Sequence, residues 1–559
     1  MQSRFHYHIK NLKNIAHNIV VPFILVASVL LCMSFGPYFY SNPVGYLDPW
    51  YYLTYFLNPQ ISICRWDGLY YTSRLPHILP SALWYQLFQP AFANKICNFS
   101  TLLMMTVSLY VFSERRILDA IICSLWVFIP ANIASVVWDY PDGTAIAWGI
   151  AGLAFCTFQP KKEYQKIQTL QVAAGFCFWS SFTTVNTTII PIAGICFSTL
   201  IFSQKKGLIP LISSWFLGGV ISFIIWAFSS KLLGGSFMYF WPQIVQSYWT
   251  LTSGHLDSIV SPVSNWLPKR TALLLPFLSV FPSLFFLRKR ESPSGSKSNS
   301  IVMLSNVITA TLLIWVGLIQ NRGILETHYQ ASYWIITFIP AIVIATKILF
   351  KTDIQKILLI CILGTIFISD WKMRYFALCA IVAAYFSLLF IKKIKEFPKL
   401  NCMEIMSVLA QAIAVFSLSF SIELANKDQS LTYAKTNSTK SFNEAVSFLQ
   451  NLKSQNLLNR SRIRGIFSPQ EKEKAYLNSF CSLFLWGSPE AEYSRIMTQK
   501  KDVLREDLSP SKVCLFFSNT KIRRNFICQI ERSGKHATEK TCFQVNDQIF
   551  VSVFEINDN

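Results

Sequence analysis

The sequence predicts an all-α polytopic membrane domain of about 13 transmembrane helices, followed by a small C-terminal α/β or α+β domain. Of the 559 residues, 52% are hydrophobic and only 14% are charged, and the mean hydropathy is +0.37. A soluble chain typically carries about 25% charged residues. Residues 1–425 hold 45 charged residues, whereas the much shorter 426–559 holds 34. This composition excludes disordered, collagen-like and small disulfide-rich proteins.

Apolar runs long enough to cross a bilayer recur along the first segment. They lie at 18–38, 97–113, 117–136, 143–159, 168–203, 208–230, 271–287, 300–319, 331–348, 356–370, 375–391 and 403–425. The run 168–203 is long enough for two helices, and it has a polar midpoint at Thr183, Thr184, Asn186 and Thr187. A shorter aromatic piece at 78–93, bounded by prolines, is predicted to lie in the membrane interface rather than to cross it.

The distribution of Lys and Arg orients these spans. With a cytoplasmic N-terminus, the cytoplasmic segments collect 21 basic residues and the outer loops collect nine, as the positive-inside rule requires. The first run lacks a small-residue cleavage site, and Leu31 precedes Cys32, so we interpret it as a membrane helix. An odd number of spans then places the C-terminal domain outside. We expect a multi-pass protein of the plasma or inner membrane.

The predicted cytoplasmic side carries no recognisable ligand motif. It has no glycine-rich phosphate loop, no G-x-G-x-x-G after a strand and no C-x-x-C pair, which argues against a nucleotide-driven pump. Much of the net charge of +21 sits at membrane ends, so nucleic acid is not an expected partner.

The predicted outer side is different, because it has two long segments at 39–96 and 231–270. Segments of that size in a compact domain are usually functional. The first contains Asp48, Arg65 and Arg74, and the next outer turn reads WDYPDG. Several alternatives remain open here. Asp before Gly is common in turns, Trp and Tyr often anchor a protein at the interface, and Arg74 before a Leu-Pro pair is also typical of a residue that reaches the lipid headgroups.

Three stretches together resemble the membrane-embedded glycosyltransferases of the GT-C type, in particular the branch with protein O-mannosyltransferases and aminoarabinose transferases. They are GYLDPWYYLTYFLN (45–58), YYTSRLPHILPSALWYQLF (70–88) and SVVWDYPDGTAIAWGIAGLAF (135–155). The resemblance implies a GT-C-like fold and an acid at Asp48 that acts on the acceptor or supports a metal. It implies a second functional acid at Asp139 or Asp142, and a contact between Arg74 and the donor phosphate. Two departures are that Asp48 is followed by Pro49 rather than Glu, and that Arg74 replaces the usual Lys.

The residues themselves suit transfer from a lipid-borne sugar. A carboxylate such as Asp48 can take the proton of an acceptor hydroxyl, and an Arg fork such as Arg74 can stabilise a leaving phosphate. Arg65 and Arg322 are further candidates for the phosphate. The candidate acids and arginines lie in the predicted outer segments, and the predicted cytoplasmic side has no nucleotide-binding motif. We therefore predict a polyprenyl-phosphate-linked sugar donor rather than a sugar nucleotide. Direct displacement would make this an inverting hexosyl- or pentosyltransferase.

Other groups are expected near the same substrate cleft, and a divalent cation is a further expectation. The cleft candidates are Tyr51, Tyr52, Tyr71, His77, His255 and His328. Two neighbouring acids, Asp48 and Asp139, are oxygen ligands of the kind that divalent cations prefer, and His255 is an additional ligand candidate. A solvated or interfacial role for the two histidines His255 and His328 is the competing interpretation.

The domain 426–559 shows mixed patterns. Apolar residues at helical spacing predict a helix over 442–452, and β-branched and aromatic residues predict strands at 513–518 and 548–556. Its cysteines are Cys481, Cys514, Cys528 and Cys542, which allow three disulfide pairings or free thiols.

Two other functions compete with transfer. A transporter or flippase of a lipid-linked glycan would bury ionisable residues in mid-membrane, and a non-catalytic scaffold would not need the outer acids. The sequence does not specify the sugar, the oligomeric state or the acceptor, which is a lipid, a glycan or a protein.

Overall fold

The structure is a computed structural model of the whole chain. It describes residues 19–31, 33, 47–113, 117–128, 130–137, 141–158, 164–203, 207–252, 260–261, 280, 283–284, 287, 297–319, 324–325, 328–350, 353–365, 371–394, 462–466, 511–517, 524, 527–528, 531–532, 534–544 and 550–558.

The described part of residues 1–400 is helical apart from a short pair of strands. After a first helix over Ile19–Leu31, the elements are α2 (Leu47–Leu57), α3 (Pro59–Arg65), the 3-10 helix η1 (Tyr70–Ser73), α4 (Leu75–Leu87), α5 (Pro90–Val111), α6 (Ile117–Val127), α7 (Pro130–Val137), α8 (Pro141–Thr157), α9 (Tyr164–Thr184), the 3-10 helix η2 (Asn186–Thr188), α10 (Ile189–Phe202), α11 (Leu208–Leu232), α12 (Trp241–Thr252), α15 (Lys297–Ile319), α16 (His328–Leu349), α17 (Asp353–Gly364) and α18 (Trp371–Ile394). Strands β1 (Val260–Ser261) and β2 (Ile324–Leu325) pair antiparallel.

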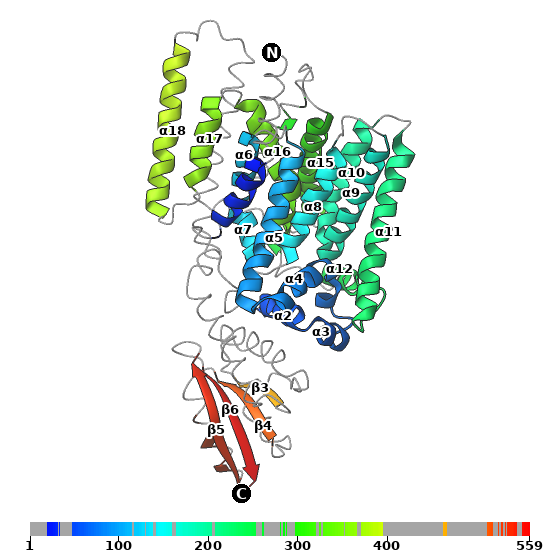
Figure 1. The fold of residues 1–559 in the computed structure, drawn as a ribbon, viewed down its shortest axis with the longest axis vertical. Helices are drawn as coiled ribbons and strands as arrows, with labels where there is room; N and C mark the ends of the chain where they lie inside the picture. Colours follow the sequence, from blue (N-terminus) through cyan, green and yellow to red (C-terminus); the bar gives the residue numbers. More distant parts are fainter. Residues whose placement is uncertain are drawn as a thin grey trace, which may run out of the picture.

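Helix α8 lies in the middle of the bundle, α9 packs against it, and α11 packs on α9 at the edge of the bundle (Figure 1). The crossing of α9 and α11 depends on a glycine. A Cβ added to Gly175 of α9 would lie 2.1 Å from the backbone oxygen of Trp215 in α11. No side chain fits there, so this position sets how closely the two backbones approach.

Where the structure describes them, the predicted spans coincide with helices, with two corrections to their boundaries. The run 168–203 forms two helices, α9 and α10, joined at the predicted polar midpoint by η2, so that prediction is confirmed. The run 117–136 is not one helix, because α6 ends at Val127 and a new helix starts at Pro130; proline cannot continue a helix but is favoured at its first position. For the same reason the piece 78–93 is divided, since α4 ends at Leu87 and α5 starts at Pro90.

Among the residues that the structure describes, α11 is the one helix that is both long and apolar enough to cross a bilayer. The predicted span 403–425 lies outside the described residues, as does most of 271–287. The count of 13 spans stays a prediction.

The two long segments predicted to lie outside pack on each other. Helices α2, α3 and α4 lie together at one end of the bundle, next to α12 (Figure 1). The backbone N–H of Ser236 donates to Asp67 Oδ1 at 3.0 Å, and Gly234 lies against Cys64. The described residues 47–96 and 231–252 therefore pack together.

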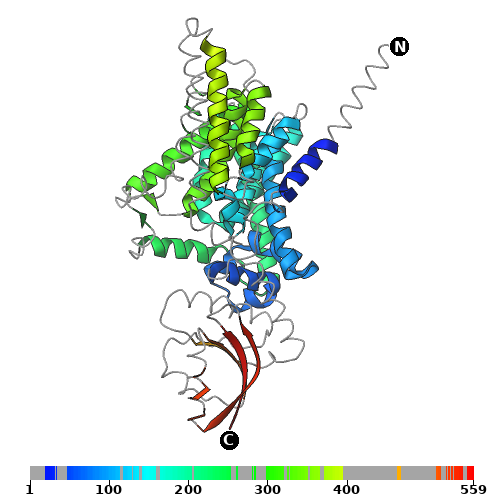
Figure 2. The same ribbon diagram turned by 90° about the vertical axis from the view of Figure 1, so that its left-hand side faces the viewer.

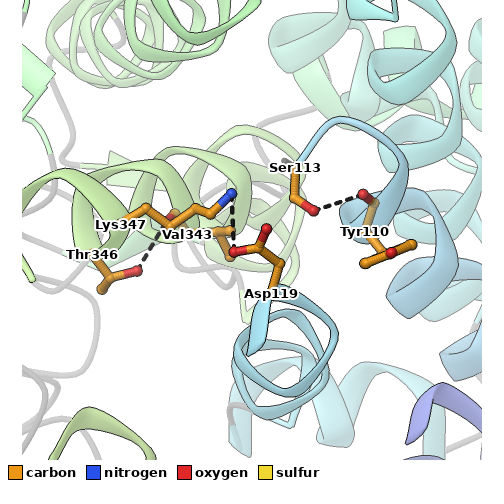
Figure 3. Close-up of polar contacts among 6 residues, drawn as sticks. All are labelled: Tyr110, Ser113, Asp119, Val343, Thr346 and Lys347. Carbon is orange, nitrogen blue, oxygen red and sulfur yellow. Dashed lines mark hydrogen bonds and ion pairs between the residues drawn. The ribbon is translucent and has the colours of Figure 1, made fainter. Parts of the chain in front are cut away.

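An ion pair between α6 and α16 lies near the other end of the bundle. Figure 3 shows Lys347 of α16 reaching toward Asp119 of α6, and the Nζ–Oδ1 distance is 3.1 Å. The two side chains are 14% and 6% exposed. Asp119 is in the first turn of its helix and Lys347 in the last turn of its helix, where each charge is favoured by the helix dipole. Lys347 is one of the 21 basic residues that the sequence places on the cytoplasmic side, and the structure pairs it with Asp119.

The C-terminal part contains a four-stranded sheet in the order β3-β4-β6-β5, built from β3 (Arg462–Ile466), β4 (Ser511–Phe517), β5 (Lys535–Gln544) and β6 (Phe550–Asp558). Strands β3 and β4 are parallel and the other pairs antiparallel. Both predicted strands are confirmed as β4 and β6, and the sheet lies beyond the end formed by α2–α4 (Figures 1 and 2). The predicted helix 442–452 is outside the described residues. Cys528 and Cys542 are free thiols; Cys481 is not described, and Cys514 is described by its backbone in β4.

Candidate functional site

Arg74 sits at the junction between η1 and α4. A new helix starts here, because Pro76 is in the first turn of α4. The backbone N–H that proline lacks would have no partner within the helix at that position. Arg74 itself is the residue that precedes α4 and lies outside helical geometry, with φ −94° and ψ 44°. Its side chain is only 8% exposed, so the fold buries a permanent positive charge at the end of the bundle.

Aromatic rings hold this guanidinium in place. Nη1 of Arg74 donates to Tyr52 Oη at 2.5 Å. Cζ lies 4.4 Å from the ring centroid of Tyr70 and 5.7 Å from that of Tyr52, both within the range of cation–π attraction. The two ring contacts and the hydrogen bond from Nη1 together restrict the orientation of the planar guanidinium.

The rings around Arg74 form a packed cluster from three elements. The ring of Tyr52 in α2 lies edge-on to Tyr71 of η1 at 5.7 Å and to His77 of α4 at 5.2 Å. His77 is also edge-on to Phe56 at 5.2 Å. Tyr52 and Phe56 are almost completely buried, which makes this end of the bundle rigid.

The first turn of α8 completes the described site. Asp142 is 6% exposed and lies in that turn, where the helix dipole favours a carboxylate. Pro141 starts the helix, and a Cβ on Gly143 would lie 2.8 Å from the backbone oxygen of Ser135 in α7. The alternative that Asp142 and Gly143 form a turn between spans is therefore wrong, because both are inside α8.

Two contacts join α4 to α8. Nδ1 of His77 lies 2.9 Å from Thr144 Oγ1, two residues after Asp142. Further along α8, Trp148 Nε1 donates to the backbone oxygen of Pro76 at 3.4 Å. The turn with Arg74 and the turn with Asp142 are thus neighbours in the folded chain.

The second long segment closes over the same turn. Ser73 Oγ donates to Gln243 Oε1 of α12 at 3.4 Å, and Asn186 of η2 donates to Ser247 of α12. Tyr239, just before α12, is nearly buried. Burial raises the pKa of the Tyr239 phenol to about 12, so it keeps its proton at neutral pH.

The structure brings several predicted site residues together and leaves others undescribed. Those brought together are Tyr52, Tyr71, Arg74, His77 and Asp142. Those described by their backbone alone are Asp48 and Tyr51 of α2, Arg65 of α3 and His328 of α16. Those outside the described residues are Asp139, His255 and Arg322. Asp48 precedes Tyr52 by one helical turn.

Three further residues contact the predicted ones. Tyr70 stacks on Arg74, Thr144 contacts His77, and Gln243 contacts Ser73. The sequence marks Tyr70 only as one of many polar and aromatic residues of the first outer segment, and it does not mark Thr144 or Gln243 at all. Tyr70 lies four residues before Arg74, a spacing that gives a weak local signal. Thr144 and Gln243 are ordinary helix residues whose partners are 67 and 170 positions away, and no local pattern marks such pairs.

The predicted divalent cation site would use Asp48, Asp139 and His255 as ligands. Over the described part of the chain, no group of three or more His, Cys, Asp or Glu side chains comes together. Of the predicted ligands, Asp139 and His255 lie outside that part, and Asp48 is described by its backbone only. The cation therefore stays a prediction.

Comparison with known proteins gives matches among solved structures only. No family model and no curated protein matches the sequence. ArnT from Cupriavidus metallidurans in the apo state is 12% identical with a TM-score of 0.49, and the alignment covers 98% of each chain. The apo oligosaccharyltransferase of Archaeoglobus fulgidus is 11% identical with a TM-score of 0.41, over 83% of this chain and 64% of that one.

A third solved structure, the arabinosyltransferase EmbB of Mycobacterium smegmatis, is 10% identical with a TM-score of 0.38, over 74% of this chain and 40% of that one. The TM-scores of these three structures are all below 0.5. The proposed function therefore rests on this chain's own residues and contacts.

Proposed function

We propose that this chain is a membrane glycosyltransferase of the GT-C type. It transfers a sugar from a polyprenyl-phosphate-linked donor to an acceptor hydroxyl at the outer face of the membrane. The observation that carries the proposal is the buried guanidinium of Arg74, held by Tyr52 beside the first turn of α8 with Asp142. A buried cation on one element, joined by a side-chain contact to a helix whose first turn carries a buried carboxylate, suits a reaction that breaks a sugar–phosphate bond.

Arg74 binds the donor phosphate in this proposal. Tyr52 accepts a hydrogen bond from Nη1 of this guanidinium, whose N–H donors form a planar fork. A fork of this kind matches phosphate oxygens, and the interaction strengthens as the leaving phosphate gains charge. A preorganised donor of this kind lowers the barrier because it needs no reorientation during the reaction. Arg65 and Arg322 are proposed as further phosphate ligands.

The acceptor is activated by a carboxylate. Asp48 takes the proton of the acceptor hydroxyl, the acceptor oxygen bonds to the anomeric carbon, and the bond from that carbon to the phosphate oxygen breaks. The products are the glycoside, polyprenyl phosphate and protonated Asp48, and the single displacement inverts the anomeric centre. Asp139 and Asp142 are proposed to orient the acceptor and to support the charge of the site. General base catalysis typically contributes about 10²–10⁴-fold.

The proposed topology follows from the charge distribution. Residues 1–425 form the membrane domain, with a cytoplasmic N-terminus, and 426–559 form an outer domain. Packing of residues 47–96 on residues 231–252 supports one common side for both long segments. The position of the β-sheet beyond the α2–α4 end (Figure 1) is consistent with the same side. A divalent cation held by Asp48 and Asp139 remains part of the proposal, and chelation followed by addition of Mg²⁺ or Zn²⁺ tests it.

The test is transfer by purified protein in proteoliposomes that contain a radiolabelled polyprenyl-phosphate sugar. Candidate sugars and acceptors come from mass spectrometry of envelope glycolipids and glycans with and without the protein. We expect Arg74→Gln and Asp48→Asn to abolish transfer in a folded protein, and Arg74→Lys to retain a small part. Arg532→Gln, at an exposed residue of the C-terminal part, is the matched control and keeps full activity.

Other outcomes favour the competing functions. Movement of the intact lipid-linked sugar across the bilayer without a new glycosidic bond indicates a flippase. Full activity in Asp48→Asn removes that residue as the base. Accessibility labelling that finds residues 48 and 139 on opposite sides of the membrane contradicts the shared outer site.

A further inference from the structure

The turn from Ser73 to His77 is joined to three other elements. Arg74 contacts Tyr52 of α2, Ser73 contacts Gln243 of α12, and His77 contacts Thr144 of α8. The contact of His77 is the one closest in sequence to Asp142. It therefore connects the element that holds the cation to the element that holds the described carboxylate.

The environment of His77 fixes the direction of its ring. The side chain is 5% exposed, and the rings of Tyr52 and Phe56 both lie edge-on at 5.2 Å. A ring packed in this way has little freedom to rotate about its side-chain bonds. Nδ1 then points at Thr144 Oγ1, 2.9 Å away, in the first turn of α8.

We infer that His77 is a positioning residue, which holds the Arg74 turn in register with the first turn of α8. This inference rests on the proposed function. His77 acts through the backbone of α4 and through Thr144, rather than by touching the donor or the acceptor. It differs from the role expected from the sequence, in which His77 lines the substrate cleft. The polar contact sets the distance between the phosphate-binding and carboxylate sides of the site.

The consequence is a defect in turnover with little change in donor binding. The contact of Arg74 with Tyr52 survives when His77 is changed, so the phosphate still binds. Loss of the contact between His77 and Thr144 shifts the phosphate-binding and carboxylate sides of the site relative to each other. A misplacement of about 1 Å can cost about 100-fold in rate. We expect kcat to fall about 10- to 100-fold while KM for the donor changes less than about threefold.

Four variants test this in proteoliposomes. His77→Phe keeps the ring among Tyr52 and Phe56 but removes Nδ1, and Thr144→Val removes the partner oxygen at constant shape. His77→Asn places an amide near the position of Nδ1 and is expected to recover part of the lost kcat. Thr199→Val is the matched control, because Thr199 makes a buried contact with Cys156 near the other end of α8; it is expected to leave kcat unchanged.

The decisive comparison is between the kcat of the double variant and the kcat of each single variant. The double variant His77→Phe with Thr144→Val should be no slower than either single variant, since both remove one interaction. Additive losses, an equal loss in Thr199→Val, or unchanged kcat in both single variants of an active protein overturn the inference.

Hydrogen exchange gives a readout that does not depend on transfer. Exchange at the first turn of α4 should become faster in His77→Phe, while protection of α9 stays unchanged. Faster exchange with unchanged kcat shows a purely structural contact and overturns the positioning role. If the wild type transfers no sugar at all, the proposed function fails, and the exchange result then shows separately whether the α4–α8 contact exists.

Discussion

Replacing Tyr52 with Phe removes one oxygen from the centre of the candidate site and leaves the rest of the side chain in place. Tyr52 is completely buried, and its Oη accepts the hydrogen bond from Arg74 Nη1 at 2.5 Å. The Phe ring retains the edge contacts with Tyr71 and His77. It also retains the attraction between the ring and the Arg74 charge, whose Cζ is 5.7 Å from the ring centroid.

The expected loss follows from that single hydrogen bond. A hydrogen bond to a charged group contributes about 1.5–3 kcal/mol. If all of this energy is used to direct Arg74 toward the donor phosphate, kcat/KM falls about 10- to 150-fold, since each 1.36 kcal/mol is tenfold. The free energy of unfolding should fall by a similar amount, because a buried N–H loses its acceptor.

The assay compares transfer and thermal unfolding for Tyr52→Phe and Tyr55→Phe. Tyr55 is on the same helix, is 1% exposed and packs on Trp66 at 5.6 Å, so it reports the general cost of losing a buried hydroxyl. We expect Tyr55→Phe to lower stability but not kcat/KM. Unchanged kcat/KM in Tyr52→Phe would refute the role of this hydroxyl, and with it the argument that Arg74 is directed by Tyr52.

Three further predictions concern stability. Asp119→Asn leaves the mostly buried ammonium of Lys347 without its carboxylate and should cost about 3–5 kcal/mol; combining it with Lys347→Met should recover most of the loss in thermal unfolding, and no recovery contradicts the ion pair. Gly175→Ala forces a Cβ against α11 and should cost about 1–3 kcal/mol, whereas Gly219→Ala, with its nearest neighbour at 4.0 Å, should be nearly neutral; equal melting temperatures would contradict the close crossing. The pKa of Tyr239 is raised by burial from 10.0 to about 12, so the stability it contributes is complete below pH 10 and is lost as the pH rises toward 12. Between these limits the free energy of unfolding should fall by roughly 2–3 kcal/mol more than in Tyr239→Phe, and identical alkaline unfolding curves would contradict the burial of this phenol.

Much of the helical architecture is readable from local pattern. Apolar runs located the helices, and the polar residues from Thr183 to Thr187 located the break between α9 and α10. The boundaries at Pro90 and Pro130 were placed wrongly because a continuous apolar run hides a helix that stops and restarts. In the C-terminal part, β4 and β6 are β-branched and aromatic and were found, whereas β5, which reads KHATEKTCFQ, is polar and was missed.

In the candidate site, too, some residues are recognisable in the sequence and others only in the structure. Arg74 and Asp142 stand out in the sequence because they are charged residues within two positions of a Pro or Gly, beside apolar runs. Their surroundings do not, since Tyr70, Thr144 and Gln243 become site residues only through partners supplied by other elements. The burial of Asp142 inside α8, rather than in an exposed turn, likewise depends on packing with α7.

The sequence by itself predicted the class of protein, located many of the helical segments and indicated the chemistry available at one end of the bundle, because hydropathy, proline and charge act over a few neighbouring residues. Only the tertiary structure decided which groups meet. Tyr52 turns toward Arg74 and His77 toward Thr144 because α4 packs against both α2 and α8. Contacts between residues 22 and 67 positions apart are set by the balance of packing over the whole bundle, and no short stretch of sequence encodes that balance.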